Sequence, residues 1–128
     1  MKEDKKIILI VDDDPLINRM YQVCFEREGY KVNTAANGEE ALMSVIKEMP
    51  DIMLLDVMMP KMNGVEVLKR LKKDPKTKGI PVLILTNLAD KKDDVDAAKK
   101  LGAIDYFVKS NTELKDLAKY VKSVLEKN

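Results

Sequence analysis

The chain has 128 residues, enough for one domain with a single core, and its 23 basic and 22 acidic residues leave a formal charge of +1. Such a balance gives no bulk attraction to nucleic acid or to an anionic membrane, and the apolar runs are too short to cross a bilayer. Cys24 is the single cysteine and there is no histidine, which excludes an internal disulfide and histidine-based catalysis or metal binding. We expect a cytoplasmic protein that binds neither nucleic acid nor membrane.

The first predicted unit is a buried strand followed by a helix. Residues 6–11 (KIILIV) form a continuous apolar run, typical of a strand that is buried on both faces. Three carboxylates, residues 12–14, follow it. Pro15 then opens a helix with Asp14 as its N-cap, and Gly29 ends the helix. Its expected inward residues are Leu16, Met20, Val23 and Cys24.

The next two units lead to the central stretch of the chain. Residues 30–35 alternate and predict an edge strand, after which Asn37 and Gly38 turn the chain into a second helix. The expected inward residues of that helix are Ala41, Leu42, Val45, Ile46 and Met49. A third strand, residues 52–55, ends in the carboxylate of Asp56. The turn signals that follow it are Met59-Pro60 and Asn63-Gly64.

The second half of the chain continues the alternation of strands and helices. A helix marked by Val65, Leu68 and Leu71 ends near Asp74, and a strand over 81–85 ends in Thr86. The remaining predicted elements are a short polar helix over 93–101 stopped by Gly102, a strand over 104–108 ending in Lys109, and a helix over 112–126 capped by Thr112.

Five strands alternating with five helices predict an α/β fold, a doubly wound parallel sheet with helices on both faces. The flavodoxin-like strand order 2-1-3-4-5 places the ends of the first and third strands side by side. In that order, Asp12 and Asp13 lie next to Asp56. Thr86 and Lys109 flank them at the same edge of the sheet, where ligands of such folds bind.

This set of side chains predicts phosphoryl chemistry. Crowded carboxylates repel each other unless a cation joins them, and oxygen ligands without His or Cys favour Mg²⁺ or Mn²⁺. Asp56 is the candidate nucleophile, since a carboxylate that accepts a phosphoryl group forms an acyl phosphate. Lys109 would supply a positive charge and Thr86 a hydroxyl donor to the phosphoryl oxygens.

These residues, together with Gly64 and Tyr106, resemble the response-regulator receiver domain over essentially the whole chain, residues 1–128. The resemblance implies that Asp56 takes a phosphoryl group from a partner histidine kinase or phosphotransfer protein. It also implies that Asp13, Asp56 and the Met58 carbonyl bind Mg²⁺, with Asp12 acting through water. Movement of Thr86 would let Tyr106 turn inward and change the surface of the fourth helix, fifth strand and fifth helix.

The resemblance further implies a monomer or a phosphorylation-dependent dimer, and a chain that catalyses only its own phosphoryl transfer and dephosphorylation. Three residues depart from the usual pattern. Asn87 is larger than the usual residue after Thr86, Met58 is apolar, and Ser110 replaces the usual proline after Lys109. A cis bond before Ser110 would cost roughly 2.5–4 kcal/mol, so we expect a trans bond.

Two other functions fit parts of the pattern. The first is a Mg²⁺-dependent phosphohydrolase of the haloacid-dehalogenase type, in which Asp12 of the Asp12-x-Asp14 motif would be the nucleophile. It is disfavoured because the stretch after Lys109 carries no acidic residue at a strand end. The second is a receiver-like protein that binds partners without phosphate. The complete acidic set argues against it.

Overall fold

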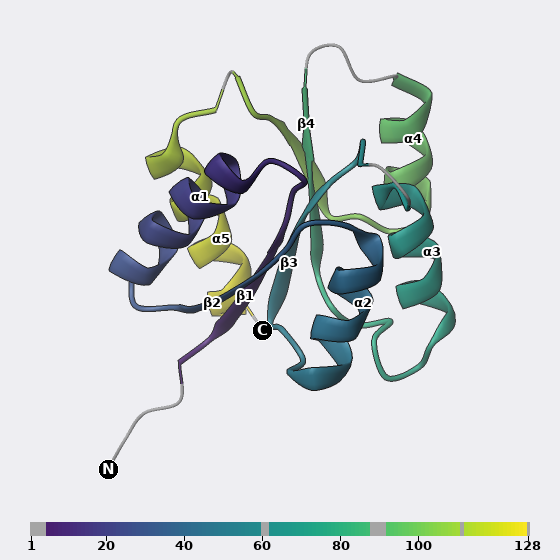
Figure 1. Cartoon of the computed structure of the whole chain (residues 1–128), viewed down its shortest axis with the longest axis horizontal. Coiled ribbons are helices and arrows are strands. Elements are labelled where there is room, and N and C mark those ends of the chain that lie inside the picture. Colours follow the sequence, from purple (N-terminus) through teal and green to yellow (C-terminus); the bar gives the residue numbers. More distant parts are fainter. Residues whose placement is uncertain (1–4, 60–61, 88–91, 111, 128) are drawn as a thin grey trace.

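The computed structural model describes residues 5–59, 62–87, 92–110 and 112–127, so Pro60 of the predicted turn lies outside the described residues. Strands and helices alternate along the chain (Figure 1). The strands are β1 (Ile7–Val11), β2 (Lys31–Ala35), β3 (Ile52–Asp56), β4 (Val82–Thr86) and β5 (Asp105–Val108). The helices are α1 (Pro15–Arg27), α2 (Gly38–Lys47), α3 (Gly64–Lys73), α4 (Lys92–Lys100) and α5 (Leu114–Lys127).

The strands form one parallel sheet in the order β2-β1-β3-β4-β5, which confirms the predicted flavodoxin-like arrangement. Helices α1 and α5 cover one face, and α2, α3 and α4 cover the other (Figure 1). The predicted edge position of β2 is also confirmed. Because β1 and β3 are neighbours, the segments that follow them lie side by side at the carboxyl edge of the sheet.

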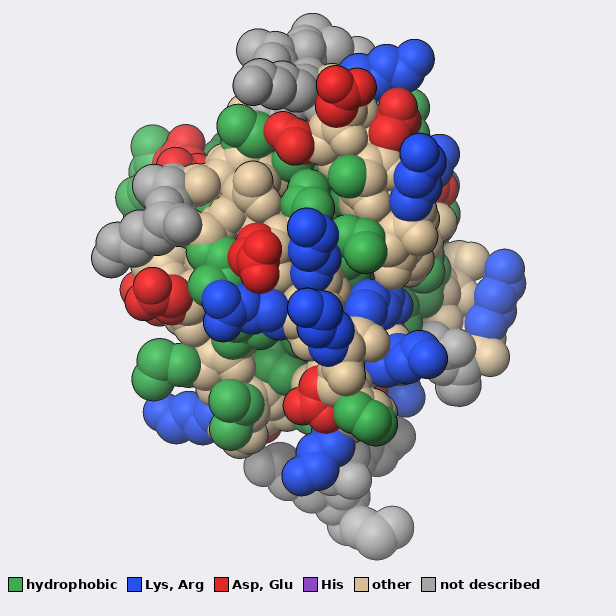
Figure 2. Space-filling view, turned by 90° about the vertical axis from the view of Figure 1, so that its right-hand side faces the viewer, with side chains coloured by type: hydrophobic (Ala, Val, Ile, Leu, Met, Phe, Trp, Pro, Cys, Tyr) green, Lys and Arg blue, Asp and Glu red, His purple; other side chains and the backbone are tan. Residues whose placement is uncertain are grey.

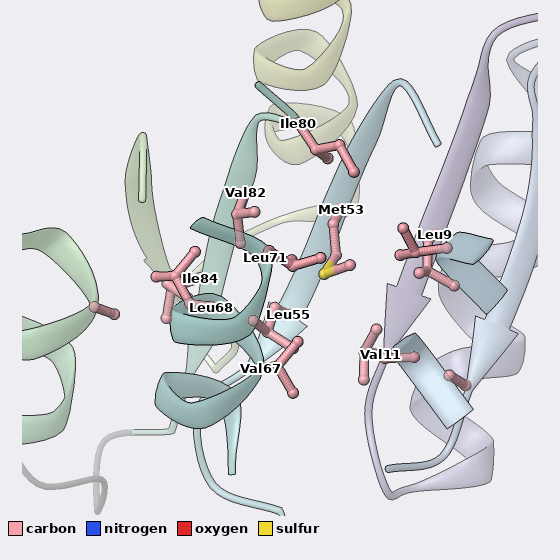
Figure 3. Packing of buried hydrophobic residues seen from close by; sticks show 14 of the residues in the cluster. Leu9, Val11, Met53, Leu55, Val67, Leu68, Leu71, Ile80, Val82 and Ile84 are labelled. Atoms are coloured by element: carbon pink, nitrogen blue, oxygen red, sulfur yellow. The ribbon is translucent and has the colours of Figure 1, made fainter. Parts of the chain in front are cut away.

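The apolar strands supply two cores because successive side chains of a strand point to opposite faces. In β1, Leu9 belongs to the core under α2, α3 and α4, whereas Ile8 and Ile10 belong to the core under α1 and α5. Burying each such side chain contributes about 1.5–3 kcal/mol. Figure 3 shows the first core, whose labelled members are Leu9, Val11, Met53, Leu55, Val67, Leu68, Leu71, Ile80, Val82 and Ile84.

Three helices begin at a side-chain cap. Asp14 accepts a hydrogen bond from the backbone N–H of Leu16, as the predicted N-cap role of Asp14 requires. Asn37 and Asn63 cap α2 and α3 in the same way, so the two Asn-Gly pairs are helix starts. The predicted cap of the last helix, Thr112, is wrong. Helix α5 begins at Leu114, so the residue directly before it is Glu113.

The predicted inward faces of the first two helices are partly wrong. Leu16 is 78% exposed and Met20 is also exposed, while the buried residues of α1 are Asn18, Tyr21 and Phe25. In α2, Ala41 and Val45 are buried as predicted, but Ile46 is 85% exposed. Met49 is exposed and lies beyond the end of this helix. Each helix carries apolar residues on two adjacent stripes, so the periodicity alone could not show which stripe faces the sheet.

Basic residues lie in the last turns of the helices. Basic side chains occupy the last turns of α3 and α4, where they interact favourably with the helix dipole; they are Arg70, Lys72, Lys73, Lys99 and Lys100. Figure 2 shows Lys and Arg side chains gathered across the middle of the face that α3 and α4 present.

Within the described ranges, no helix combines the length and the apolar composition needed to cross a membrane.

Candidate functional site

The acidic residues after β1 and β3 meet at the carboxyl edge of the sheet. Asp12, Asp13 and Asp56 each place one carboxylate oxygen within 4.8 Å of the oxygens offered by the other two. Asp12 and Asp56 are buried, whereas Asp13 is exposed. A cluster of three oxygen donors that is reached from solvent through Asp13 suits a hard divalent cation, so the acidic cluster could hold a metal ion.

Asp56 ends β3 and is only 1% exposed. The backbone N–H of Met58 donates a hydrogen bond of 3.3 Å to Asp56 Oδ1. Loss of solvent raises the pKa of Asp56 to about 7, helped by the negative charge of Asp12 and opposed by the ammonium of Lys109. Near neutral pH this carboxylate therefore lies close to its own titration point.

Lys109 follows β5 and reaches across the end of the sheet. Its Nζ lies 2.6 Å from Asp12 Oδ2 and 3.3 Å from Asp56 Oδ2, and its side chain is 10% exposed. The backbone N–H of Lys109 donates to the Thr86 carbonyl at 2.7 Å, which anchors the residue to β4. Burial disfavours the ammonium, but the hydrogen bond to Asp12 and the charge of Asp56 outweigh it and raise the pKa of Lys109.

Asp12 is held at four polar atoms. Its N–H donates to the Ala35 carbonyl, and its carbonyl accepts from Asn18 Nδ2. Its Oδ1 accepts from the Asp14 N–H at 2.9 Å, and its Oδ2 accepts from Lys109. Since all four groups are engaged, Asp12 is a fixed part of the site.

The cavity at this edge contains most of the predicted residues but not Thr86. Thr86 ends β4, is 3% exposed and does not line the cavity. The peptide bond between Lys109 and Ser110 is trans, as expected. The lining residues are Asp12, Asp13, Asp14, Ile17, Asp56, Met58, Asn87, Lys109 and Ser110.

Tyr106 lies on β5 with 42% of its surface exposed. The ammonium of Lys99, on α4, lies 5.2 Å from the centroid of its ring, a cation–π contact. The structure therefore shows the outward position of Tyr106, and the inward position remains a prediction.

Sequence reasoning missed Asn18. This residue is on the inner face of α1, is 8% exposed and contacts the backbone of the acidic turn. Its signal in the sequence was an amide directly after the apolar pair Leu16-Ile17, in a helix that starts immediately after three carboxylates.

Known proteins resemble this chain in sequence and structure. The transcriptional regulatory protein PhoP for alkaline phosphatase synthesis, from Bacillus subtilis, is 44% identical over 104 residues, covering 81% of this chain and 42% of that protein. The DNA-binding dual master transcriptional regulator RpaA, from Synechocystis, is 39% identical over 102 residues, with coverage of 80% and 42%. A CheY-like response regulator receiver domain protein from Methanospirillum hungatei superposes with a TM-score of 0.88 at 31% identity, with coverage of 97% and 96%.

The chain spans about two fifths of the length of PhoP and of RpaA. Because RpaA is described as DNA-binding, these relatives do not support the expectation that the present chain has no contact with nucleic acid. The family model described as the response regulator receiver domain matches residues 8–122, nearly the whole chain. The chain therefore belongs to the response regulator receiver domain family of two-component signalling systems.

Proposed function

We propose that the chain is a phospho-accepting receiver in which Asp56 takes a phosphoryl group from a partner protein. The observation that carries this proposal is the placement of Asp56, buried beside a lysine and next to two further carboxylates. Receiver domains interact with histidine kinases or phosphotransfer proteins. Since this chain has no histidine, any phosphohistidine donor must lie outside these 128 residues.

The transfer of the phosphoryl group is a displacement at phosphorus. A carboxylate oxygen of Asp56 attacks phosphorus, the P–N bond of the donor's phosphohistidine breaks, and its electron pair returns to the imidazole nitrogen. The product is an acyl phosphate on Asp56. Lys109 already contacts Asp56 Oδ2. Its ammonium can therefore contact a negatively charged phosphoryl oxygen once Asp56 carries the phosphoryl group. Thr86, at the end of β4, would donate its hydroxyl to another.

The ion that fits the acidic cluster best is Mg²⁺, with Mn²⁺ as a substitute, because the donors are all oxygens. Asp13, Asp56 and the Met58 carbonyl would hold it directly, and Asp12 would act through water. Asp12 suits the indirect role because both of its carboxylate oxygens already accept hydrogen bonds. When bound, such an ion supplies positive charge that offsets the charge of the phosphoryl group.

Exposed apolar residues on α1 support a docking site there for the partner protein that donates the phosphoryl group. Leu16 and Met20 project from the helix that starts directly after the acidic turn. Scattered exposed apolar residues are ordinary, but two on one helix beside the reacting carboxylate suit a docking contact. We place the kinase or phosphotransfer protein against this part of α1.

The output of phosphorylation is a change at Tyr106. A phosphoryl group adds a charge of about −1.5 to −2 at neutral pH, which would draw the hydroxyl of Thr86 toward Asp56. Space vacated at the end of β4 would let Tyr106 turn inward, and the surface of α4, β5 and α5 would change. In this role the chain is a switch that catalyses only its own phosphorylation and dephosphorylation, in the cytoplasm, as a monomer or as a dimer formed on phosphorylation.

A small phosphodonor tests the proposal without the kinase. The chain is incubated with phosphoramidate, with Mg²⁺ or with EDTA, and the modified residue is mapped by mass spectrometry. We expect one Mg²⁺-dependent phosphoryl group on Asp56 and none on Asp56→Asn. Label on Asp12 would instead support the phosphohydrolase, and a chain that does not bind Mg²⁺ would support the receiver-like protein without phosphate chemistry.

A further inference from the structure

We propose that Asn18 is a positioning residue that sets the direction of the metal-binding carboxylates after β1. This inference rests on the proposed function, because it concerns the same acidic cluster. Asn18 lies on the first part of α1 and does not belong to the acidic cluster itself. Its effect would act through the backbone of Asp12 and Asp13.

The amide of Asn18 links the residue after β1 to the last residue of β2. Nδ2 donates to the Asp12 carbonyl at 2.8 Å and to the Ala35 carbonyl at 3.2 Å. Because carbonyl oxygens only accept hydrogen bonds, the atom that faces them must be the NH₂ group, and the orientation of the amide is settled. The turn after β1 is thereby tied to the end of β2, where the Asp12 N–H also donates to Ala35.

The bond to the Asp12 carbonyl controls Asp13. A peptide group is planar, so the Asp12 carbonyl, the Asp13 nitrogen and the Asp13 Cα move as one unit. The hydrogen bond from Asn18 therefore fixes the orientation of the Asp12–Asp13 peptide group, and with it the position of the Asp13 Cα that carries the side chain. Asp13 is the exposed member of the cluster, so this backbone constraint sets where its carboxylate can reach.

The second observation is an orphaned polar atom. Among the described residues, Asn18 Oδ1 is the buried side-chain polar atom that lacks a hydrogen-bond partner. Asn18 and Asp13 line the same cavity, so a water molecule held there could donate to Oδ1. Burying an amide with one unpaired oxygen costs about 1–3 kcal/mol, a cost that an apolar residue at this inward position would avoid. The presence of an amide at position 18 is therefore better explained by its hydrogen bond to the acidic turn than by packing in the core.

Two variants and one matched control test the inference. Asn18→Leu keeps the branched shape of the side chain but removes both N–H donors, and Asn18→Ala removes the side chain beyond Cβ. Gln22→Ala is the control, because Gln22 carries the same amide one turn later and lines the same cavity, but bonds to Glu26. Mg²⁺ affinity is measured by calorimetry on folded protein, together with the thermal unfolding midpoint.

Loss of an outer-shell partner lowers metal affinity about 10–100-fold, so we expect at least a tenfold higher Mg²⁺ dissociation constant for both Asn18 variants and less than a twofold change for Gln22→Ala. Phosphorylation by phosphoramidate should be slowed most at low Mg²⁺ and recover at saturating Mg²⁺. A purely structural role would lower the unfolding midpoint without changing Mg²⁺ affinity, and that result would overturn the inference alone. A wild-type chain that binds no Mg²⁺ would overturn the proposed function as well.

Discussion

Gly64 lies against the backbone of Asp56. A Cβ on Gly64 would stand 2.5 Å from the Asp56 carbonyl oxygen and 3.0 Å from the Cα of Val57. The N–H of Gly64 donates to the Val57 carbonyl at 2.7 Å, so the start of α3 is fastened to the end of β3. The first residue of α3 is thereby held against the segment that carries the proposed nucleophile.

Replacing Gly64 with alanine should disturb the site and the fold together. The new methyl group would meet backbone atoms, which cannot move aside as a side chain can, so β3 and α3 must separate. We expect Gly64→Ala to lower the free energy of unfolding by about 1–3 kcal/mol and to slow phosphorylation by phosphoramidate. Chemical denaturation measures the first effect and intact-mass kinetics the second.

Gly79→Ala is the matched control for this substitution. A Cβ at Gly79 meets no atom within 4 Å, so the change should alter stability by no more than about 0.5 kcal/mol. Equal effects of the two substitutions would show that the close approach of Gly64 to Asp56 has no consequence.

Asp56 should destabilise the metal-free protein at alkaline pH. Its pKa rises from 3.8 to about 7 on folding, so the folded state binds a proton more tightly than the unfolded state between these values. Stability therefore falls as the pH rises through this window, and the loss is complete above pH 7. Asp56→Asn removes this dependence, and without metal it should be more stable than wild type at pH 8 by on the order of 2–4 kcal/mol.

Urea denaturation in EDTA at several pH values between 4 and 8 measures this difference. The gain should shrink toward pH 4, where the folded wild type keeps its proton and the carboxyl of the unfolded chain also begins to take one up. Saturating Mg²⁺ should reverse the order at pH 8 by stabilising wild type alone. A stability difference that is constant from pH 5 to pH 8 would contradict the elevated pKa.

Lys109→Ala should cost more stability than a surface lysine. The change leaves Asp12 and Asp56 buried without their cation, and breaking a buried ion pair from one side costs about 3–5 kcal/mol. Protonation of Asp56 relieves part of this cost, so we expect a loss of about 3 kcal/mol at pH 8 in EDTA and a smaller loss at pH 5. Thermal unfolding at the two pH values measures both.

The control is Lys115→Ala, which breaks an exposed pair with Glu113. Exposed pairs contribute at most about 1 kcal/mol, so the control should change little at either pH. If Lys109→Ala unfolds at the same temperature as the control, the buried pairing does not contribute to stability.

The strands could be located from the sequence because burial on both faces demands continuous apolar runs. The runs that predict β1, β3 and β4 agree with the structure to within one or two residues, and the polar residues that follow them mark the carboxyl edge. The helix faces were harder to predict. Leu16 and Ile17 are adjacent apolar residues, as are Val45 and Ile46, and only the sheet decides which of each pair packs against a core.

The composition of the site was predictable, but its internal contacts were not. Strand order brings Asp12, Asp13 and Asp56 together whatever their rotamers are. The depth of Asp56 and the choice of Asp12 as the closer partner of Lys109 depend on contacts between residues that are far apart in the sequence. Three-dimensional contacts of this kind leave no periodic signal in the sequence.

Lys99 should bias Tyr106 toward its outward position. The contact between the Lys99 ammonium and the Tyr106 ring exists only while the ring is outward, and an exposed cation–π contact contributes about 0.5–1 kcal/mol. Lys99→Ala should therefore raise the ratio of inward to outward Tyr106 in unphosphorylated protein about two- to fivefold.

Carbon-13 NMR of ring-labelled tyrosine measures this ratio, with the Tyr106 signal assigned from Tyr106→Phe. Lys100→Ala, the neighbouring substitution on α4, controls for the loss of one positive charge. Beryllofluoride with Mg²⁺, which mimics the phosphoryl group, should drive wild type and both variants to the same inward signal. If Lys99→Ala and Lys100→Ala shift the Tyr106 signal equally, general electrostatics rather than the ring contact sets its position, because a charge effect does not require the ammonium to lie over the ring.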